Sequence, residues 1–178
     1  MRMEDLRSAP VPPLAPDDHV RGPDGAPLVI VYADFTCPKC AATWARLPHG
    51  ELRVGFRHFA LKAKHPRAVA LAHAAEAAAL QGAFWAMADA LYADPGRIDD
   101  PYLWARCERL NLDLERFEAD RRSPAVAARV REQVRGALAA GITMTPTLVG
   151  QEGTGDLVPE WTSSDTDREA TPRSSTEG

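Results

Sequence analysis

Two cysteines three positions apart, Cys37 and Cys40, stand where an apolar run gives way to a helical segment. The run LVIVYADF before them (28–35) is short and rich in β-branched residues, which is typical of a buried central strand. Pro38 favours the first turn of a helix, because its missing N–H would have no partner there. This order of strand, C-x-x-C and helix constrains the fold more than any other feature of the chain.

The remaining elements predict a β-α-β unit followed by a long helical block. LRVGFRHFA (52–60) predicts a second strand, and a β-α-β unit requires a parallel pair with a right-handed crossover. Residues of about 64–140 are strongly helical, and Gly141 is a natural end for the last helix. ITMTPTLVG (142–150) then predicts a β segment broken by Pro146. We therefore expect an α/β fold with an inserted α-helical subdomain.

Composition and charge limit the number of domains and the class of protein that the chain can form. A chain of 178 residues, with 45% hydrophobic and 26% charged residues, can bury one real core. Residues 1–18 predict a flexible N-terminal arm, residues 19–154 one domain, and residues 155–178 a disordered polar tail. The net charge of −4 predicts no nucleic-acid surface, and no window is long and apolar enough to span a membrane.

Three roles compete for the cysteine pair. In a redox pair, Cys37 attacks a disulfide as a thiolate, which free helix N–H groups, the helix dipole and the Lys39 cation favour. Cys40, one turn further, then attacks the mixed disulfide. A zinc site needs two further ligands, and neither Cys107 nor the five histidines form a second C-x-x-C or an H-x-x-x-H. In the third interpretation both cysteines are core residues. The strand and helix around the pair favour the redox role.

With DFTCPKC and GITMTPTLVG both present, the chain resembles the DsbA-like thiol–disulfide oxidoreductases of thioredoxin-like fold. It is most similar to the bacterial branch that also occurs fused to sodium/proton antiporters, and the resemblance covers about residues 18–149. It implies a DsbA-like thioredoxin domain over residues 19–154, with the helical insertion at about 64–140. It also implies a cis proline at Pro146 that faces the cysteines, and a backbone at Thr145 and Pro146 that pairs with an extended substrate segment.

Two features depart from that family. Many members carry a buried acid six positions before the first cysteine, thought to handle the proton of the second, and this chain has Val31 there. Asp34 matches an acid common in the branch and is expected to cap or to form an ion pair. We expect the C-terminal strand and helix of the family to be incomplete, because residues 162–178 lack apolar periodicity. A partner or a second copy would then cover the exposed sheet.

We therefore expect a thiol–disulfide oxidoreductase that acts on protein or small-molecule substrates through Cys37 and Cys40, supported by Pro38, Lys39 and Asp34. No cofactor and no metal are expected. The expected partners are protein thiols or disulfides, an unidentified redox partner and, in a dimer, a second copy. The alternative is a catalytically weak thioredoxin-like module that binds a protein or a metal. The N-terminus does not read as a signal peptide, so a cytoplasmic location is expected.

Other polar and sulfur-bearing residues have structural interpretations. Cys107 is expected to be a buried structural thiol, since it stands in helical register with apolar neighbours. His58 follows the second strand and is expected to be structural, because disulfide exchange needs no base beyond the thiolate. A solvated helix face is expected for Arg129, Arg131 and Arg135.

Overall fold

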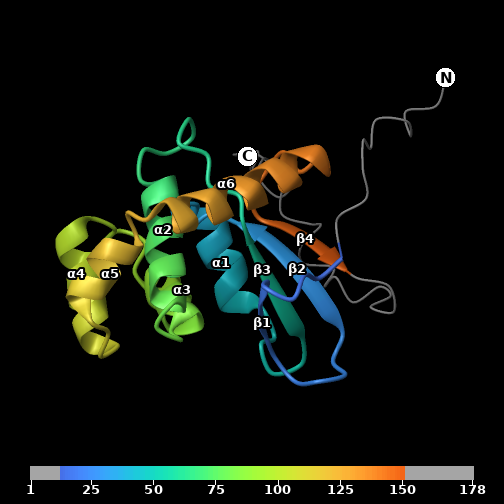
Figure 1. The fold of residues 1–178 in the computed structure, drawn as a ribbon. Helices are drawn as coiled ribbons and strands as arrows, with labels where there is room; N and C mark the ends of the chain where they lie inside the picture. Colours follow the sequence, from blue (N-terminus) through green and yellow to red (C-terminus); the bar gives the residue numbers. More distant parts are fainter. Residues whose placement is uncertain (1–12, 151–178) are drawn as a thin grey trace, which may run out of the picture.

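The computed structural model describes residues 13–150 and shows there a four-stranded mixed sheet with six helices (Figure 1). The strands are β1 (His19–Arg21), β2 (Leu28–Ala33), β3 (Arg53–His58) and β4 (Thr147–Gly150). The helices are α1 (Pro38–Arg46), α2 (Ala68–Ala79), α3 (Phe84–Ala93), α4 (Asp100–Arg109), α5 (Leu114–Asp120) and α6 (Pro124–Ala139). The predicted polar tail, the predicted incomplete C-terminal elements and the first twelve residues of the predicted arm lie outside the described residues.

The strand order is β1-β3-β2-β4. Strands β2 and β3 are parallel and are joined through α1, so the predicted β-α-β unit is confirmed. β1 and β4 pair antiparallel to β3 and β2 respectively. In this register Val31 of the central strand lies between Phe56 and Leu148.

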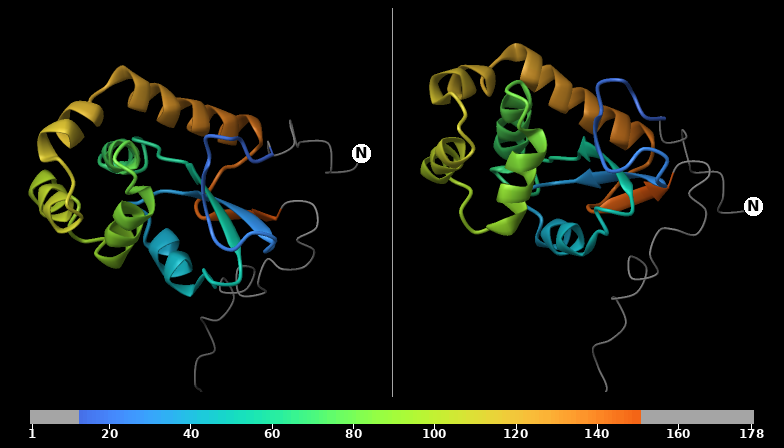
Figure 2. Two further views of the ribbon diagram at one scale, coloured as in Figure 1. Left: turned by 60° about the horizontal axis from the view of Figure 1, so that its bottom comes forward. Right: turned by 90° about the horizontal axis from the view of Figure 1, so that it is seen from below.

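Alternation along β2 sends side chains into two layers. Val29 and Val31 join the core cluster that contains Trp44 of α1, whereas Ile30 and Tyr32 join a second cluster with Ala137 of α6. Figure 2 shows α1 and α6 on opposite faces of the sheet. Because both faces are covered, the strand is apolar along its whole length, as its sequence predicts.

Helices α2 to α5 extend from one end of the sheet (Figure 1). The alanine-rich α2 packs against α3 and α6, and most of its side chains are buried. The guanidinium of Arg106 in α4, 1% exposed, closes the end of α3. It donates to the main-chain oxygens of Ala90, Asp94, Arg97 and Tyr102. Of these, the oxygen of Ala90 lies in the last turn of α3, where main-chain oxygens lack a partner within the helix. Within residues 13–150, no helix is long and apolar enough to cross a membrane.

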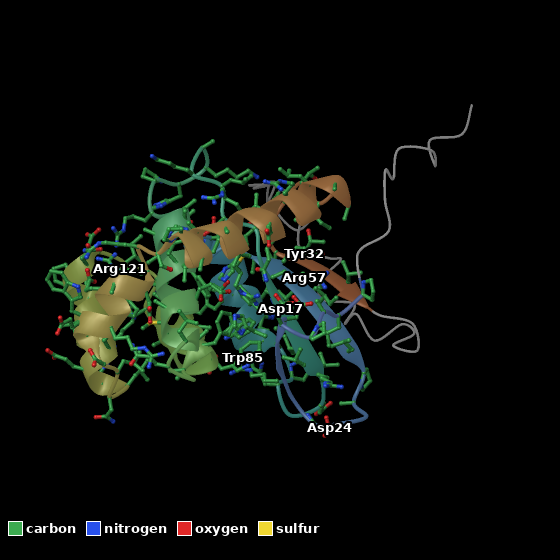
Figure 3. The ribbon with its side chains drawn as sticks, viewed as in Figure 1. Asp17, Asp24, Tyr32, Arg57, Trp85 and Arg121 are labelled. Carbon is green, nitrogen blue, oxygen red and sulfur yellow. The ribbon has the colours of Figure 1, made fainter. Side chains whose placement is uncertain are left out.

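Residues 13–18, which the sequence assigned to a loose arm, contact the sheet. Arg57 in β3 is 6% exposed and donates from Nη2 to Oδ2 of Asp18 at 2.6 Å and from Nη1 to the Tyr32 hydroxyl at 3.0 Å. The carboxylate of Asp17, the residue before Asp18, accepts from Nη1 of Arg129 at 2.6 Å. Asp17, Tyr32 and Arg57 are labelled over the strands in Figure 3. The buried ion pair therefore fixes the chain before β1 on the sheet.

A buried carboxylate connects α2 to β1, β3 and α6. Oε1 of Glu76 accepts from Nε2 of His58 at 2.9 Å and from Nε2 of His19 at 3.0 Å, and its Oε2 accepts from Nε of Arg129 at 2.8 Å. Burial alone would raise the pKa of Glu76, but hydrogen bonds from His19 and His58 hold it well below its usual range. The prediction of a solvated helix face is wrong for Arg129, because its guanidinium bonds to this buried carboxylate. His58 makes the structural contacts that its sequence position suggested.

Candidate active site

The two cysteines lie at the start of α1. Cys37 is the N-cap residue, with extended backbone angles (φ −85°, ψ 117°), and Pro38 opens the first turn. Cys37 is partly exposed, Cys40 is 2% exposed, and the two residues approach each other to 3.4 Å. Both are free thiols. The predicted position of the pair, between a buried strand and a helix, is confirmed.

The turn that presents Cys37 is closed by Asp34. β2 ends at Ala33, and Oδ1 of the buried Asp34 carboxylate accepts from the main-chain N–H of Thr36 at 2.8 Å and from its hydroxyl at 2.7 Å. The main-chain oxygen of Asp34 accepts from the N–H of Cys37 at 3.1 Å. The Asp34 side chain therefore forms an Asx-type turn before the helix, whereas the N-cap residue Cys37 has no side-chain cap hydrogen bond.

A segment distant in sequence lies against the pair. The peptide bond between Thr145 and Pro146 is cis. Sγ of Cys37 donates to the main-chain oxygen of Thr145 at 3.6 Å, and the Thr145 side chain hydrogen-bonds Cys40. The structure therefore brings both proposed substrate-binding residues to the cysteines, and Thr145 contacts both thiols.

Cys40 is held as a thiol by its surroundings. Burial raises its pKa far above the ordinary value, and the neighbouring Cys37 raises it further. The main chain of Asp34 and the side chain of Thr145 lower it in part. Cys107, in α4, is 0% exposed as predicted, and burial raises its pKa to about 11. At neutral pH both buried sulfurs therefore carry their protons.

The remaining predicted residues divide between surface and core. Pro38 and Lys39 are exposed on the first turn of α1. Val31, at the position where an acid was expected, is 1% exposed and belongs to the same core cluster as Cys40. No group of three or more His, Cys, Asp or Glu residues within 13–150 could hold a metal ion.

Sequence reasoning missed one residue of this region, Tyr92. It lies on α3, is 6% exposed, and packs against Phe35 and Trp44 with ring centroids 4.9 and 5.3 Å apart. The available signal was a tyrosine in the otherwise apolar end of FWAMADALYA, where a buried hydroxyl requires a partner. It also lines a cavity of about 540 Å³ between α1 and α3, beside Ala41.

Arg21 and Trp44 also line that cavity, and Arg21 lies between two tryptophan rings. The guanidinium of Arg21 lies 5.0 Å from the ring centroid of Trp44 and 4.8 Å from that of Trp85. Its two terminal nitrogens donate to the carboxylate of Asp89 at 2.7 and 3.0 Å, and Nε1 of Trp44 donates to the same carboxylate at 2.9 Å. This cluster joins β1, α1 and α3, so it fixes the helix that carries the cysteines.

Comparison with known proteins places this geometry in a family. A family model described as thioredoxin matches residues 14–154. A curated relative, the Na⁺/H⁺ antiporter NhaA 1 of Salinispora arenicola (strain CNS-205), is 44% identical over 146 residues. That match covers 76% of this chain and 22% of the relative, so the chain spans about a fifth of the length of the curated relatives that it matches.

Solved structures share the fold. A thioredoxin-like oxidoreductase from Silicibacter pomeroyi DSS-3 has a TM-score of 0.69 at 25% identity, over 78% of this chain and 82% of that one. Wolbachia pipientis alpha-DsbA1 has a TM-score of 0.66 at 21% identity, over 78% of this chain and 76% of that one. The expected thioredoxin-like α/β fold with inserted helices, and the resemblance to DsbA-like proteins, are thus confirmed. The chain belongs to the thioredoxin family that the matching model describes, Thioredoxin_4.

Proposed function

We propose that the domain is a thiol–disulfide oxidoreductase that exchanges disulfides with protein substrates through Cys37 and Cys40. One observation carries the proposal: a partly exposed thiol at a helix N-terminus lies 3.4 Å from a buried second thiol and opposite a cis Thr145–Pro146 bond. The oxidoreductase from Silicibacter pomeroyi DSS-3, at 25% identity, supports this chemistry.

The exchange takes two steps. The Cys37 thiolate attacks one sulfur of a substrate disulfide, which forms a Cys37–substrate disulfide and releases the other substrate sulfur as a thiolate. The Cys40 thiolate then attacks Cys37 Sγ, forms the Cys37–Cys40 disulfide and releases the second substrate thiolate. Two electrons pass from the protein to the substrate, and the reverse sequence oxidises a substrate dithiol.

The main chain at Thr145 is proposed to bind the substrate. In the dithiol form, the Thr145 oxygen accepts from Sγ of Cys37. Once Cys37 is joined to a substrate its sulfur has no proton to donate, so the same oxygen becomes free to accept an N–H from the substrate backbone. An extended segment beside Pro146 would then be held by main-chain hydrogen bonds, as in strand addition.

The proposed chemistry is that of the matched segment alone. The curated relatives are named as antiporters, and the chain spans 22% of the first of them. The direction of exchange and the redox partner depend on the redox poise of the compartment, which we propose to be the cytoplasm. Disulfide exchange requires only the two thiols, and it is the activity that the geometry supports best.

Turnover of insulin disulfides in the presence of dithiothreitol tests the proposal. The wild-type chain should accelerate the reduction, and Cys37→Ser should abolish the acceleration, because the attacking sulfur is gone. Cys107→Ser is the matched control, since Cys107 is buried in α4 away from the pair, and it should keep the activity. Undiminished activity in Cys37→Ser would contradict the proposal.

A further inference from the structure

The chain has three lysines, and they come from two segments next to the proposed site. Lys39 stands on the first turn of α1, two residues after Cys37, whereas Lys62 and Lys64 stand in the loop between β3 and α2. All three residues are exposed. None of the ion pairs within residues 13–150 involves a lysine. Their charges are therefore available to a partner.

The loop that carries two of these lysines is held against the segment before β4. Nζ of Lys64 donates to the main-chain oxygen of Thr143 at 3.4 Å. The loop is a turn, in which the main-chain oxygen of Leu61 accepts from the N–H of Lys64 at 2.9 Å. The Leu61 side chain packs against the buried cluster that contains Ile142. A polar contact and an apolar contact thus fix the position of the turn.

This position places the Lys64 charge beside the proposed path of the substrate. Thr143 and Thr145 are two residues apart, a span of at most about 7 Å. The Thr145 oxygen lies 3.6 Å from Sγ of Cys37. An extended substrate advances about 3.3 Å per residue, so the side chains within three residues of its cysteine stay within about 10 Å of the thiols. Charges interact over such distances at moderate salt.

The carboxylate nearest to Cys37 in the chain does not offset these cations. Asp34 is 6% exposed, and its Oδ1 accepts from both the N–H and the hydroxyl of Thr36. Its charge is therefore turned into the protein and stabilised there. A lysine ammonium is a compact charge on a flexible stem, which suits it to meet acidic side chains at several positions of a bound peptide.

We propose that Lys39, Lys62 and Lys64 select protein substrates whose reactive cysteine is flanked by acidic side chains. The inference rests on the proposed oxidoreductase function and names the substrate class of that site. The lysines take no part in the exchange of sulfurs. Charges at the rim of an interface act mainly on the rate of association and make it dependent on salt, so the selection is expected in the first step.

Three peptides of equal length test the inference with the reduced full chain. Each carries one cysteine, as a mixed disulfide with thionitrobenzoate, between two glutamates, two glutamines or two lysines on either side. Attack by Cys37 on the peptide sulfur joins the peptide to Cys37 and releases thionitrobenzoate, whose absorbance gives the second-order rate constant. Wild type should react fastest with the glutamate peptide and slowest with the lysine peptide, and 1 M salt should remove the difference, because the Debye length is then about 3 Å.

Lys64→Gln should lower the ratio of the glutamate rate to the glutamine rate by about two- to fivefold, the range of one exposed ion pair. Arg53→Gln is the matched control, because it removes one cation at the opposite end of the sheet. Arg53 pairs with Leu28, the first residue of β2, whereas Cys37 follows the last, so the ratio should stay as in wild type.

Two results would overturn the inference and leave the proposed function standing. Equal rates of the three peptides with wild type would mean that the site does not read charge. An equal fall of the glutamate and glutamine rates in Lys64→Gln would mean that the lysine only shapes the loop before β4. A wild-type chain that releases no thionitrobenzoate from any of the peptides would instead contradict the proposed function itself.

Discussion

Sγ of Cys37 donates to the main-chain oxygen of Thr145 at 3.6 Å, across 108 residues of sequence. This bond joins the N-terminus of α1 to the residue before the cis Pro146. The side chain of Thr145 also hydrogen-bonds Cys40. One residue of the loop before β4 therefore contacts both sulfurs of the proposed exchange, and the main chain and the side chain act on different thiols.

Thr145→Val separates these two contacts, because valine keeps the main-chain oxygen and the branched shape and removes the hydroxyl. The hydroxyl lowers the pKa of Cys40, so its loss should raise that pKa and slow the attack by Cys40 about tenfold, while attack by Cys37 continues. Stopped-flow reaction with dithiobis(nitrobenzoate) measures the effect. Attack by Cys37 releases one thionitrobenzoate in a first phase, attack by Cys40 releases a second in a unimolecular phase, and the ratio of the two rates isolates the second step. Thr43→Val makes the same change on α1 and should leave the ratio unaltered. An unaltered ratio in Thr145→Val would remove the hydroxyl from the account.

Glu76→Gln tests the buried carboxylate between α2 and α6. The side chain is 4% exposed and pairs with Arg129, so loss of its charge should cost about 3–5 kcal/mol of unfolding free energy at pH 7. The pKa of Glu76 is lowered in the folded protein, so its contribution is fully present above the unfolded-state value of about 4.3. That contribution is lost as the pH falls below this value.

Urea unfolding at a series of pH values between neutral and strongly acidic measures this dependence. Wild type should lose more stability on acidification than Glu76→Gln, because the variant has no carboxylate to protonate at this position. Other acids contribute equally to both proteins, so the difference between the two curves isolates Glu76. Parallel curves would show that the carboxylate does not stabilise the fold through its charge.

Asp18→Ala tests whether the segment before β1 belongs to the folded domain. Asp18 and Arg57 have side chains 6% and 8% exposed, so removal of the carboxylate takes away the buried contact between the two charges and should cost about 3 kcal/mol. Asp24→Ala is the control, since that side chain is 99% exposed and lies 3.9 Å from Arg53. Equal melting temperatures for the two variants would show that residues 13–18 are not needed for stability.

The parts of the fold that sequence predicted are those with a local cause. The apolar run of β2 and the proline after Cys37 lie where their composition places them, although β2 ends at Ala33, because Asp34 turns the chain back on itself. β1 was missed, since its three residues have no periodicity and exist as a strand only through pairing with β3. A short edge strand of this kind is specified by its neighbour.

The parts of the site that sequence could not predict depend on long-range contacts. The approach of Thr145 to Cys37 came from the family resemblance alone, because no local pattern relates residues so far apart. The bond from Arg129 to Glu76 was missed for the same reason: a charged residue on a helix looks solvated until its partner is known. Tyr92 was missed because its ring fits a core position and only its hydroxyl does not.

The most direct measurement of the central claim is capture of a substrate on the Cys40→Ser chain. Without the resolving thiol, Cys37 should remain joined to its substrate, and mass spectrometry of non-reduced peptides should find disulfide-linked partners on Cys37 that dithiothreitol releases. The double variant Cys37→Ser, Cys40→Ser should capture nothing. Partners found equally in both variants, or held through Cys107, would contradict the account.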